Sequence, residues 1–175
     1  GKESVALALC GTHRGERGTV LSLHRINPVP DDTCIERSAI TVAWPIEPHI
    51  PLFGEAARKG MVVLKIHSHP TGHPEFSKLD ELSDRALLGS LAHLAPNASG
   101  HASAVMLPDG KIFARVFGGN RRFTAVQRVV VVGDAVTTYD AAGGVETAPI
   151  VDEAFLRPQQ AFGRGTVARL SRMRI

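Results

Sequence analysis

Short apolar runs that end at glycine or proline dominate the first half of the chain. Two of them, 5–10 and 20–26, lie on either side of a glycine-rich, charged turn, which predicts a β-hairpin. A β-branched run at 39–44 predicts a third strand, which ends at the prolines that follow because proline cannot continue a strand ladder. Residues 52–59 then predict a short helix that stops at Gly60.

The middle of the chain predicts a buried strand followed by a long amphipathic helix. The run MVVLKIH at 61–67 is dense in β-branched residues and has apolar neighbours on both faces. From Ser77 to a point near Pro96, leucines recur at helical spacing, and Ser77-x-x-Asp80 resembles a helix cap. The leucines that define the expected apolar face are Leu79, Leu82, Leu87, Leu91 and Leu94.

Two further hairpins are predicted after this helix. Their strands are 102–107 with 112–117, and 129–132 with 135–139. Each pair brackets a turn sequence, Pro-Asp-Gly in the first and Gly-Asp in the second. Beyond residue 140 the pattern is weak and predicts only a short helix at 165–170.

Composition narrows the class of protein. The chain has 175 residues, 43% of them hydrophobic and 21% charged, which is typical of one globular domain with an appendage. No apolar run is long enough to cross a bilayer, so we expect a soluble protein without a membrane partner. The two cysteines form no CxxC pair, which favours a reducing, cytoplasmic location.

The C-terminal stretch is basic. After Glu153 it contains five arginines and no acidic residue. Arginines there could attract nucleic acid, but aromatic residues that would stack on bases are almost absent. We therefore expect a solvated or partner-facing arm and no nucleic-acid partner.

The stretch HSHPTGHPEFSKLD carries the chemistry. His67 and His69 are two apart on a predicted strand, so both imidazoles project from one face. Asp80 lies in the first turn of the next helix, from which its carboxylate can reach back to the strand end. These three residues can supply three ligands of a tetrahedral zinc site and leave the fourth position for water. His73 lies between the ligands in the sequence, and we expect it to be a loop residue and not a further ligand.

Three protein ligands with an open position is the catalytic arrangement of zinc, which activates water and polarises a carbonyl. Ser77, three residues before Asp80, is placed to hydrogen-bond a tetrahedral intermediate. A carboxylate elsewhere must shuttle the proton.

The pattern His67-x-His69-Pro70, six residues, Ser77, two residues, Asp80 resembles the signature of the JAMM (MPN, JAB-domain) metalloproteases. The resemblance implies an α/β (α+β) fold with a curved, mostly antiparallel sheet flanked by helices, covering 1–140. It implies Zn²⁺ bound by His67, His69 and Asp80, with Ser77 as oxyanion stabiliser.

The same resemblance implies a general base on an early strand. Glu3, in ESVALALCG, is the best match to the family's glutamate. Glu36, Glu47 and Glu55 are rival carboxylates.

A second resemblance concerns residues 141–175. RPQQAFGRGTVARLSRMRI resembles the segment that precedes the nucleotide loop of ThiF-like proteins, the bacterial relatives of ubiquitin-activating enzymes. It implies a linker and the start of an adenylation domain, as in a JAB and ThiF fusion of prokaryotic type.

These resemblances imply a zinc isopeptidase or peptidase that cleaves after the C-terminal Gly of a ubiquitin-like protein. Its partners would be that protein or its conjugates, a ThiF-like activating domain and a conjugating enzyme. Two alternatives stay open: a protease that processes a sulfur carrier, and a non-catalytic MPN scaffold.

Overall fold

The computed structural model describes residues 1–16, 18–132 and 136–147. The chain divides into two compact units, Gly1–Ala125 and Val126–Ile175, and each is described by itself. The domain boundary expected at residue 140 remains a prediction. The basic stretch after Glu153, the helix expected at 165–170 and the ThiF-like segment lie outside the described residues.

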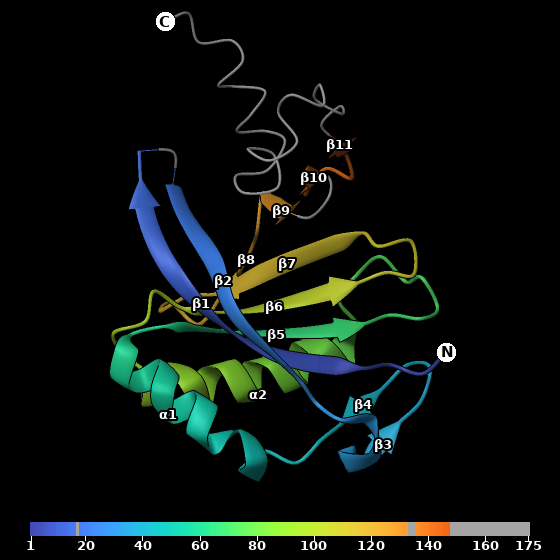
Figure 1. The fold of residues 1–175 in the computed structure, drawn as a ribbon, viewed down its shortest axis with the longest axis horizontal. Coiled ribbons are helices and arrows are strands. Elements are labelled where there is room, and N and C mark those ends of the chain that lie inside the picture. Colours follow the sequence, from blue (N-terminus) through green and yellow to red (C-terminus); the bar gives the residue numbers. More distant parts are fainter. Residues whose placement is uncertain (17, 133–135, 148–175) are drawn as a thin grey trace, which may run out of the picture. The chain divides into compact units, whose positions relative to one another are not determined.

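The first unit is built on a six-stranded sheet with the strand order β2-β1-β5-β6-β7-β8 (Figure 1). Its strands are β1 (Val5–Gly15), β2 (Gly18–Pro28), β5 (Val62–Ser68), β6 (His101–Met106), β7 (Ile112–Phe117) and β8 (Phe123–Ala125). Neighbouring strands are antiparallel except β5 and β6, which are parallel. The expected mostly antiparallel α+β fold is therefore confirmed.

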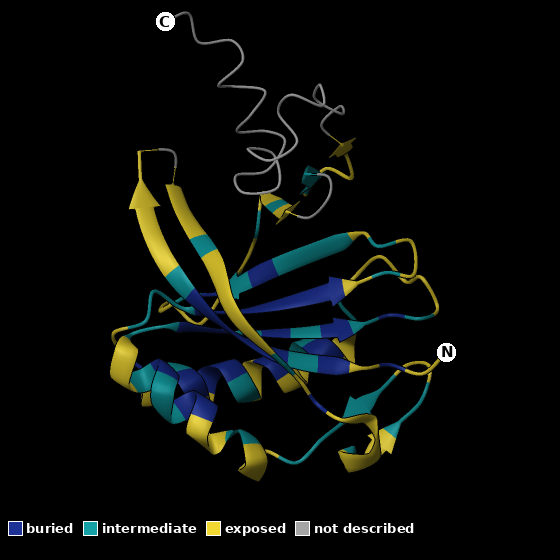
Figure 2. Cartoon of the chain, viewed as in Figure 1, coloured by how far each residue is buried: buried dark blue, intermediate teal, exposed yellow. Residues whose placement is uncertain are grey.

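Two helices, α1 (Ile50–Lys59) and α2 (Lys78–Leu94), lie together on one side of this sheet (Figure 1). The main core forms between the sheet and the helices. Its buried members are Leu7, Leu9, Leu52, Phe53, Ala56, Val63, Leu88, Leu91 and Phe117. Figure 2 shows the buried residues concentrated in the inner strands and in the inward sides of the helices, whereas most of β2 is exposed.

Strand register sorts the side chains that face the helices into rows, because paired residues project to the same face. One row, here called the ionic row, contains Lys65, Ser103 and Arg115. The next row, here called the histidine row, contains His67, Val105 and Phe113. Both rows cross β5, β6 and β7, and they bring polar groups under helix α2.

The expected helices form, with boundaries set by local chemistry. Helix α1 begins two residues earlier than expected, with Pro51 in its first turn, and ends at Gly60 in the left-handed conformation (φ 62°). Helix α2 begins after Ser77, whose side chain and that of Asp80 form a reciprocal capping box.

The predicted apolar face of α2 is partly wrong. Leu79, Leu82 and Leu94 are more than half exposed. The buried residues of the helix are Asp80, Asp84, Leu88, Gly89 and Leu91. Two aspartates occupy the inward face because basic and histidine side chains of the sheet lie opposite them.

The strand expected at 39–44 is also mostly absent. Only Val42–Ala43 (β4) is extended, paired with Glu36–Arg37 (β3). The amide of Ser38 donates to the carbonyl of Thr41, and the Ser38 hydroxyl accepts from the amide of Ile40. These bonds close residues 38–41 into a turn, which leaves two residues for pairing. Short 3₁₀ turns at Asp31–Thr33 and Glu47–His49 flank this segment.

The hairpins before the second unit agree with prediction. Strands β1 and β2 pair antiparallel with a bulge at Leu9/Cys10. Strands β6 and β7 pair across the Pro-Asp-Gly turn, where Gly110 has φ 84°. The glycine pair at 118–119 lies in a turn that leads into β8, a strand that the sequence did not predict.

The described part of the second unit is a three-stranded antiparallel sheet with the order β11-β10-β9. Its strands are β9 (Arg128–Val132), β10 (Val136–Asp140) and β11 (Val145–Thr147). The predicted hairpin of β9 and β10 is confirmed, whereas β11 was not predicted.

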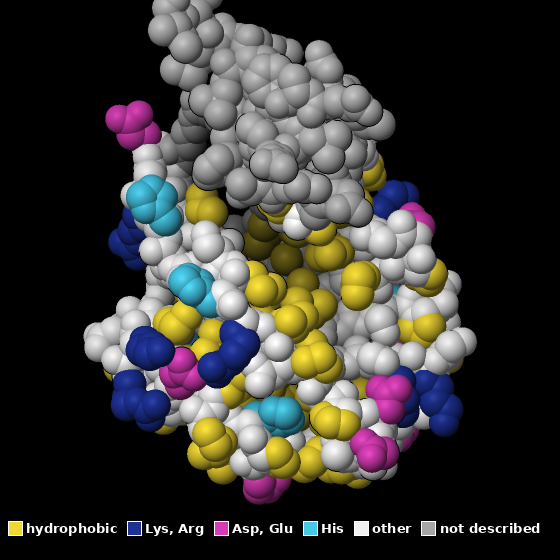
Figure 3. Space-filling view, in the orientation of Figure 1, with side chains coloured by type: hydrophobic (Ala, Val, Ile, Leu, Met, Phe, Trp, Pro, Cys, Tyr) yellow, Lys and Arg dark blue, Asp and Glu magenta, His cyan; other side chains and the backbone are white. Residues whose placement is uncertain are grey.

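The surface carries charges of both signs. In the face drawn in Figure 3, hydrophobic side chains gather toward the middle, and Lys, Arg, Asp and Glu lie toward the margins. Neither helix of the described part of the chain is long and apolar enough to span a membrane.

Candidate metal centre

Strand β5 and helix α2 together position three potential metal ligands. His67 lies near the end of β5 and is buried, and His69 follows just beyond the strand. Asp80 is the third residue of α2, where the capping box orients its carboxylate. The β-branched run that forms β5 and the Ser-x-x-Asp pattern that starts α2 therefore bring these side chains together.

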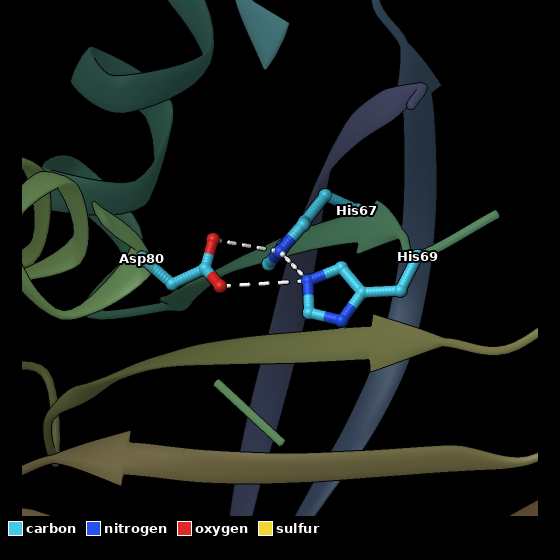
Figure 4. A group of neighbouring side chains, drawn as sticks. All are labelled: His67, His69 and Asp80. Atoms are coloured by element: carbon cyan, nitrogen blue, oxygen red, sulfur yellow. Dashed lines mark hydrogen bonds and ion pairs between the residues drawn. The ribbon is translucent and has the colours of Figure 1, made fainter. Parts of the chain in front are cut away.

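The three side chains point toward one common centre (Figure 4). His67 Nε2 lies 3.1 Å from His69 Nε2 and 2.9 Å from Asp80 Oδ1. His69 Nε2 lies 3.4 Å from Asp80 Oδ2. All three residues are buried, so water competes poorly for these atoms.

These distances fit a tetrahedral zinc ion. Ligand atoms about 2.0 to 2.1 Å from zinc at tetrahedral angles lie roughly 3.3 Å apart. The separations here are 2.9 to 3.4 Å, with Asp80 presenting Oδ1 to His67 and Oδ2 to His69. Two imidazoles and one carboxylate are also the donor types that zinc prefers. The residues present therefore fit the metal that the sequence motif implies.

The connecting loop fixes one of the rings. The backbone carbonyl of His73 lies 2.9 Å from His69 Nδ1, so that nitrogen can donate its proton to the carbonyl and leave Nε2 free to bind metal. The rings of His69 and His73 also stack, with centroids 5.9 Å apart. His73 is thus a loop residue, as expected, but its carbonyl has an orienting role that no sequence signal indicated.

Asp80 is held in its charged form. Burial alone would raise the pKa of its carboxyl, but the hydrogen bond and charge of His67, with two hydrogen bonds from Ser77, hold this pKa well below its usual value. The amide and the hydroxyl of Ser77 each donate to Asp80 Oδ2 at 2.7 Å. The charged carboxylate is the form that binds a cation.

Glu3 lies near the same group of side chains. Val5 pairs with His67, and the amide of Ser68 donates to the carbonyl of Ser4, so continuing this register places Glu3 opposite His69. The Glu3 side chain is buried, and burial raises the pKa of its carboxyl, while the nearby His67 and His69 oppose part of the rise.

The backbone of Glu3 is anchored on both sides. Its amide donates to the carbonyl of Ser38 at 2.7 Å, and its carbonyl accepts from Arg37 Nε at 2.7 Å. The β3–β4 segment therefore fixes a residue that precedes the first strand.

The rival carboxylates occupy other surroundings. Glu36 and Glu47 are exposed, and Glu55 on α1 pairs with Arg25 and Lys59. The structure brings together His67, His69 and Asp80, and Ser77 is hydrogen-bonded to Asp80. Neither Glu3 nor any of the three rivals belongs to this group of potential metal ligands, but Glu3 alone among the four carboxylates is buried beside the two histidines. The catalytic roles of Glu3 and Ser77 remain predictions.

Comparison with protein families agrees with this geometry. Residues 1–117 match the family described as prokaryotic homologs of the JAB domain. The chain belongs to this family. The matched JAB domain contains all three potential ligands together with Glu3 and Ser77. No curated protein matches the chain.

Proposed function

We propose that this JAB domain is a zinc-dependent isopeptidase or peptidase that cleaves after the C-terminal Gly of a ubiquitin-like protein. The observation that carries the proposal is the buried cluster of His67, His69 and Asp80 with zinc-like spacing. The family includes metalloisopeptidases, which supports the reaction class.

Zinc held by these three residues would lower the pKa of a water molecule to about 7 and polarise the scissile carbonyl. Glu3 supplies a carboxylate beside the centre that can accept a proton and return it to the leaving amine. The raised pKa of Glu3 brings its carboxyl closer to neutral pH, which suits that exchange.

Ser77 is assigned two tasks. Its hydroxyl donates to Asp80 Oδ2 and accepts from the amide of Asp80, so it orients a ligand. In the proposed reaction the hydroxyl also donates to the oxyanion of the tetrahedral intermediate, which requires that it turn away from Asp80.

The proposed substrate follows from the backbone conformation that a peptide needs at such a site. An extended tail that passes the metal must bring a peptide carbonyl close to buried ligands, and glycine permits the closest backbone approach. A ThiF-like activating domain and a conjugating enzyme are the proposed partners. Their support is the ThiF-like sequence near the end of the chain, which lies outside the described residues.

The test is a cleavage assay on a ubiquitin-like protein joined through its terminal Gly to a reporter, in one substrate as a linear fusion and in another through a lysine side chain. We expect cleavage after that Gly, loss of activity with a chelator, and recovery when zinc is added. Replacement of the terminal Gly by Leu should slow cleavage at least tenfold.

His67→Ala is the matched control, because it removes one ligand from the centre. Equal cleavage of an unfolded, unrelated protein would indicate a general protease. Cleavage of the linear fusion alone would favour processing of a sulfur carrier. Absence of cleavage in zinc-loaded protein would favour a non-catalytic scaffold.

A further inference from the structure

A buried group of charged side chains lies one helical turn from the candidate metal centre. It comprises the buried Lys65, Asp84 and Arg115 with the partly exposed Glu81 at its edge, and is called the ion cluster below. Asp84 is fully buried, and its two oxygens lie 2.6 Å from Lys65 Nζ and 2.8 Å from Arg115 Nη2. Arg115 Nη1 also lies 2.6 Å from Glu81 Oε2.

None of these residues belongs to the sequence motif or to the group of potential metal ligands. Burial of charged groups costs free energy, and well-packed apolar residues often give equal or greater stability. The ion cluster therefore needs an explanation other than stability of the core.

The geometry relates the ion cluster to the ligands. Asp80 and Asp84 are four residues apart on α2, and Lys65 and His67 are two residues apart on β5. One helical turn advances about 5.4 Å and two strand residues about 6.6 Å, so successive turns of α2 face successive rows of the sheet. Asp84 meets the ionic row, and Asp80 meets the histidine row.

Arg115 also contacts the loop that joins the ligands. Its guanidinium carbon lies 3.8 Å from the centre of the Phe76 ring and 3.9 Å from the centre of the Phe123 ring. Phe76 immediately precedes Ser77, the cap of α2. One side chain from β7 thus contacts the helix through Asp84 and the loop through Phe76.

We propose that the ion cluster preorganises the metal site: Asp84 and Arg115 are positioning residues that hold α2 and its preceding loop so that Asp80 faces the histidines before metal binds. The Lys65–Asp84 pair sets the separation of helix and strand without any metal. Arg115 fixes the direction from which the loop enters the helix. The inference rests on the metal site of the proposed function and does not require peptide cleavage.

The test compares variants of the 175-residue chain, each prepared without metal. Lys65→Met with Asp84→Leu removes one cation and one anion. Arg115 loses its contact with Asp84 but keeps the carboxylate of Glu81 as a partner. We expect the thermal midpoint of the metal-free protein to change by only a few degrees. The dissociation constant for zinc, measured by competition with a chromophoric chelator, should rise about 10- to 100-fold. Cobalt absorption bands should change shape at saturation, which reports altered ligand geometry.

Glu55→Gln is the matched control, because it also breaks ion pairs of a helical carboxylate, with Arg25 and Lys59, away from the ligands. It should bind zinc and cobalt like the wild type.

Arg115→Lys is the second variant. It keeps the charge but loses the planar fork and the stacking on Phe76, and it should weaken zinc binding about tenfold. Zinc affinity within threefold of wild type in the double variant overturns the inference. If the double variant does not fold, zinc affinity within threefold of wild type in Arg115→Lys overturns the inference. If the wild type binds no zinc, the proposed function fails together with this inference. If the wild type binds zinc and cleaves the substrate, and the variants bind zinc as tightly as the wild type, this inference alone fails.

Discussion

Glu3 combines three properties that a proton-transferring residue needs. It is buried, its carboxyl has a raised pKa, and its backbone is fixed by bonds to Ser38 and Arg37. It precedes the first strand, so hydrophobic periodicity gives no indication of its burial. The resemblance to the JAMM family singled it out, and the pairing of Val5 with His67 explains how it reaches the centre.

We predict that Glu3→Gln reduces the rate of cleavage at least 100-fold while zinc content stays at one ion per chain. The amide keeps the shape of the side chain but cannot accept the proton, and Glu3 is not counted among the ligands. The rate is measured in the tail-cleavage assay and zinc by elemental analysis.

The control is Glu36→Gln, which changes an exposed rival carboxylate and should retain full activity. An active Glu3→Gln together with an inactive Glu36→Gln would show that the base was assigned to the wrong residue.

The bounds of helix α2 could be predicted from the sequence, but its buried face could not. The capping pattern and leucine spacing predict its start and length correctly. The buried face was mispredicted because Asp84 is stabilised by Lys65 on β5 and Arg115 on β7, which are distant along the chain. Pattern methods assign a charged residue to the surface unless its partner is known. The grouping of His67, His69 and Asp80, in contrast, was predictable because their spacing is itself a motif.

Two glycines of helix α1 and its end allow a prediction about the free energy of unfolding. Gly54 is inside the helix, and a methyl group there would lie 3.5 Å from Arg58 Nη1, an ordinary contact. Gly60 ends the helix at φ 62°, with no atom closer than 3.9 Å to an added methyl. We expect Gly54→Ala to raise the free energy of unfolding by about 0.5 to 1 kcal/mol. Gly60→Ala should lower it by about 1 to 2 kcal/mol through backbone strain alone.

Both variants are measured by chemical denaturation of the metal-free protein, so that metal binding does not contribute. The two substitutions add the same methyl group and serve as controls for each other. Changes of the same sign would contradict the assignment of Gly60 to a left-handed cap.

At the scale of the whole molecule, the first unit contains everything that the proposed chemistry uses. Ligands, Glu3, Ser77 and the ion cluster all lie within Gly1–Ala125, and so does the main core. The family match ends at residue 117, the last residue of β7, and so excludes β8. The structural unit and the sequence family therefore differ by one short strand.

Strand β8 is predicted to be necessary for the stability of the first unit. Phe123 on β8 packs against Phe117, with ring centroids 5.1 Å apart, and its ring centre lies 3.9 Å from the guanidinium carbon of Arg115. We expect a protein that ends at Ala125 to fold and to bind one zinc ion with the affinity of the full chain. A protein that ends at residue 117 loses the Phe123 ring and leaves β7 as an unpaired edge, so its free energy of unfolding should fall by at least about 2 kcal/mol. Chemical denaturation and zinc competition on the two truncated proteins measure both quantities.

Phe123→Leu in the protein that ends at Ala125 separates the loss of the ring from the loss of the strand, since it keeps β8 and should cost only part of that stability. Equal stability of the two truncated proteins would mean that β8 is dispensable and that the family boundary is also the boundary of the folded unit.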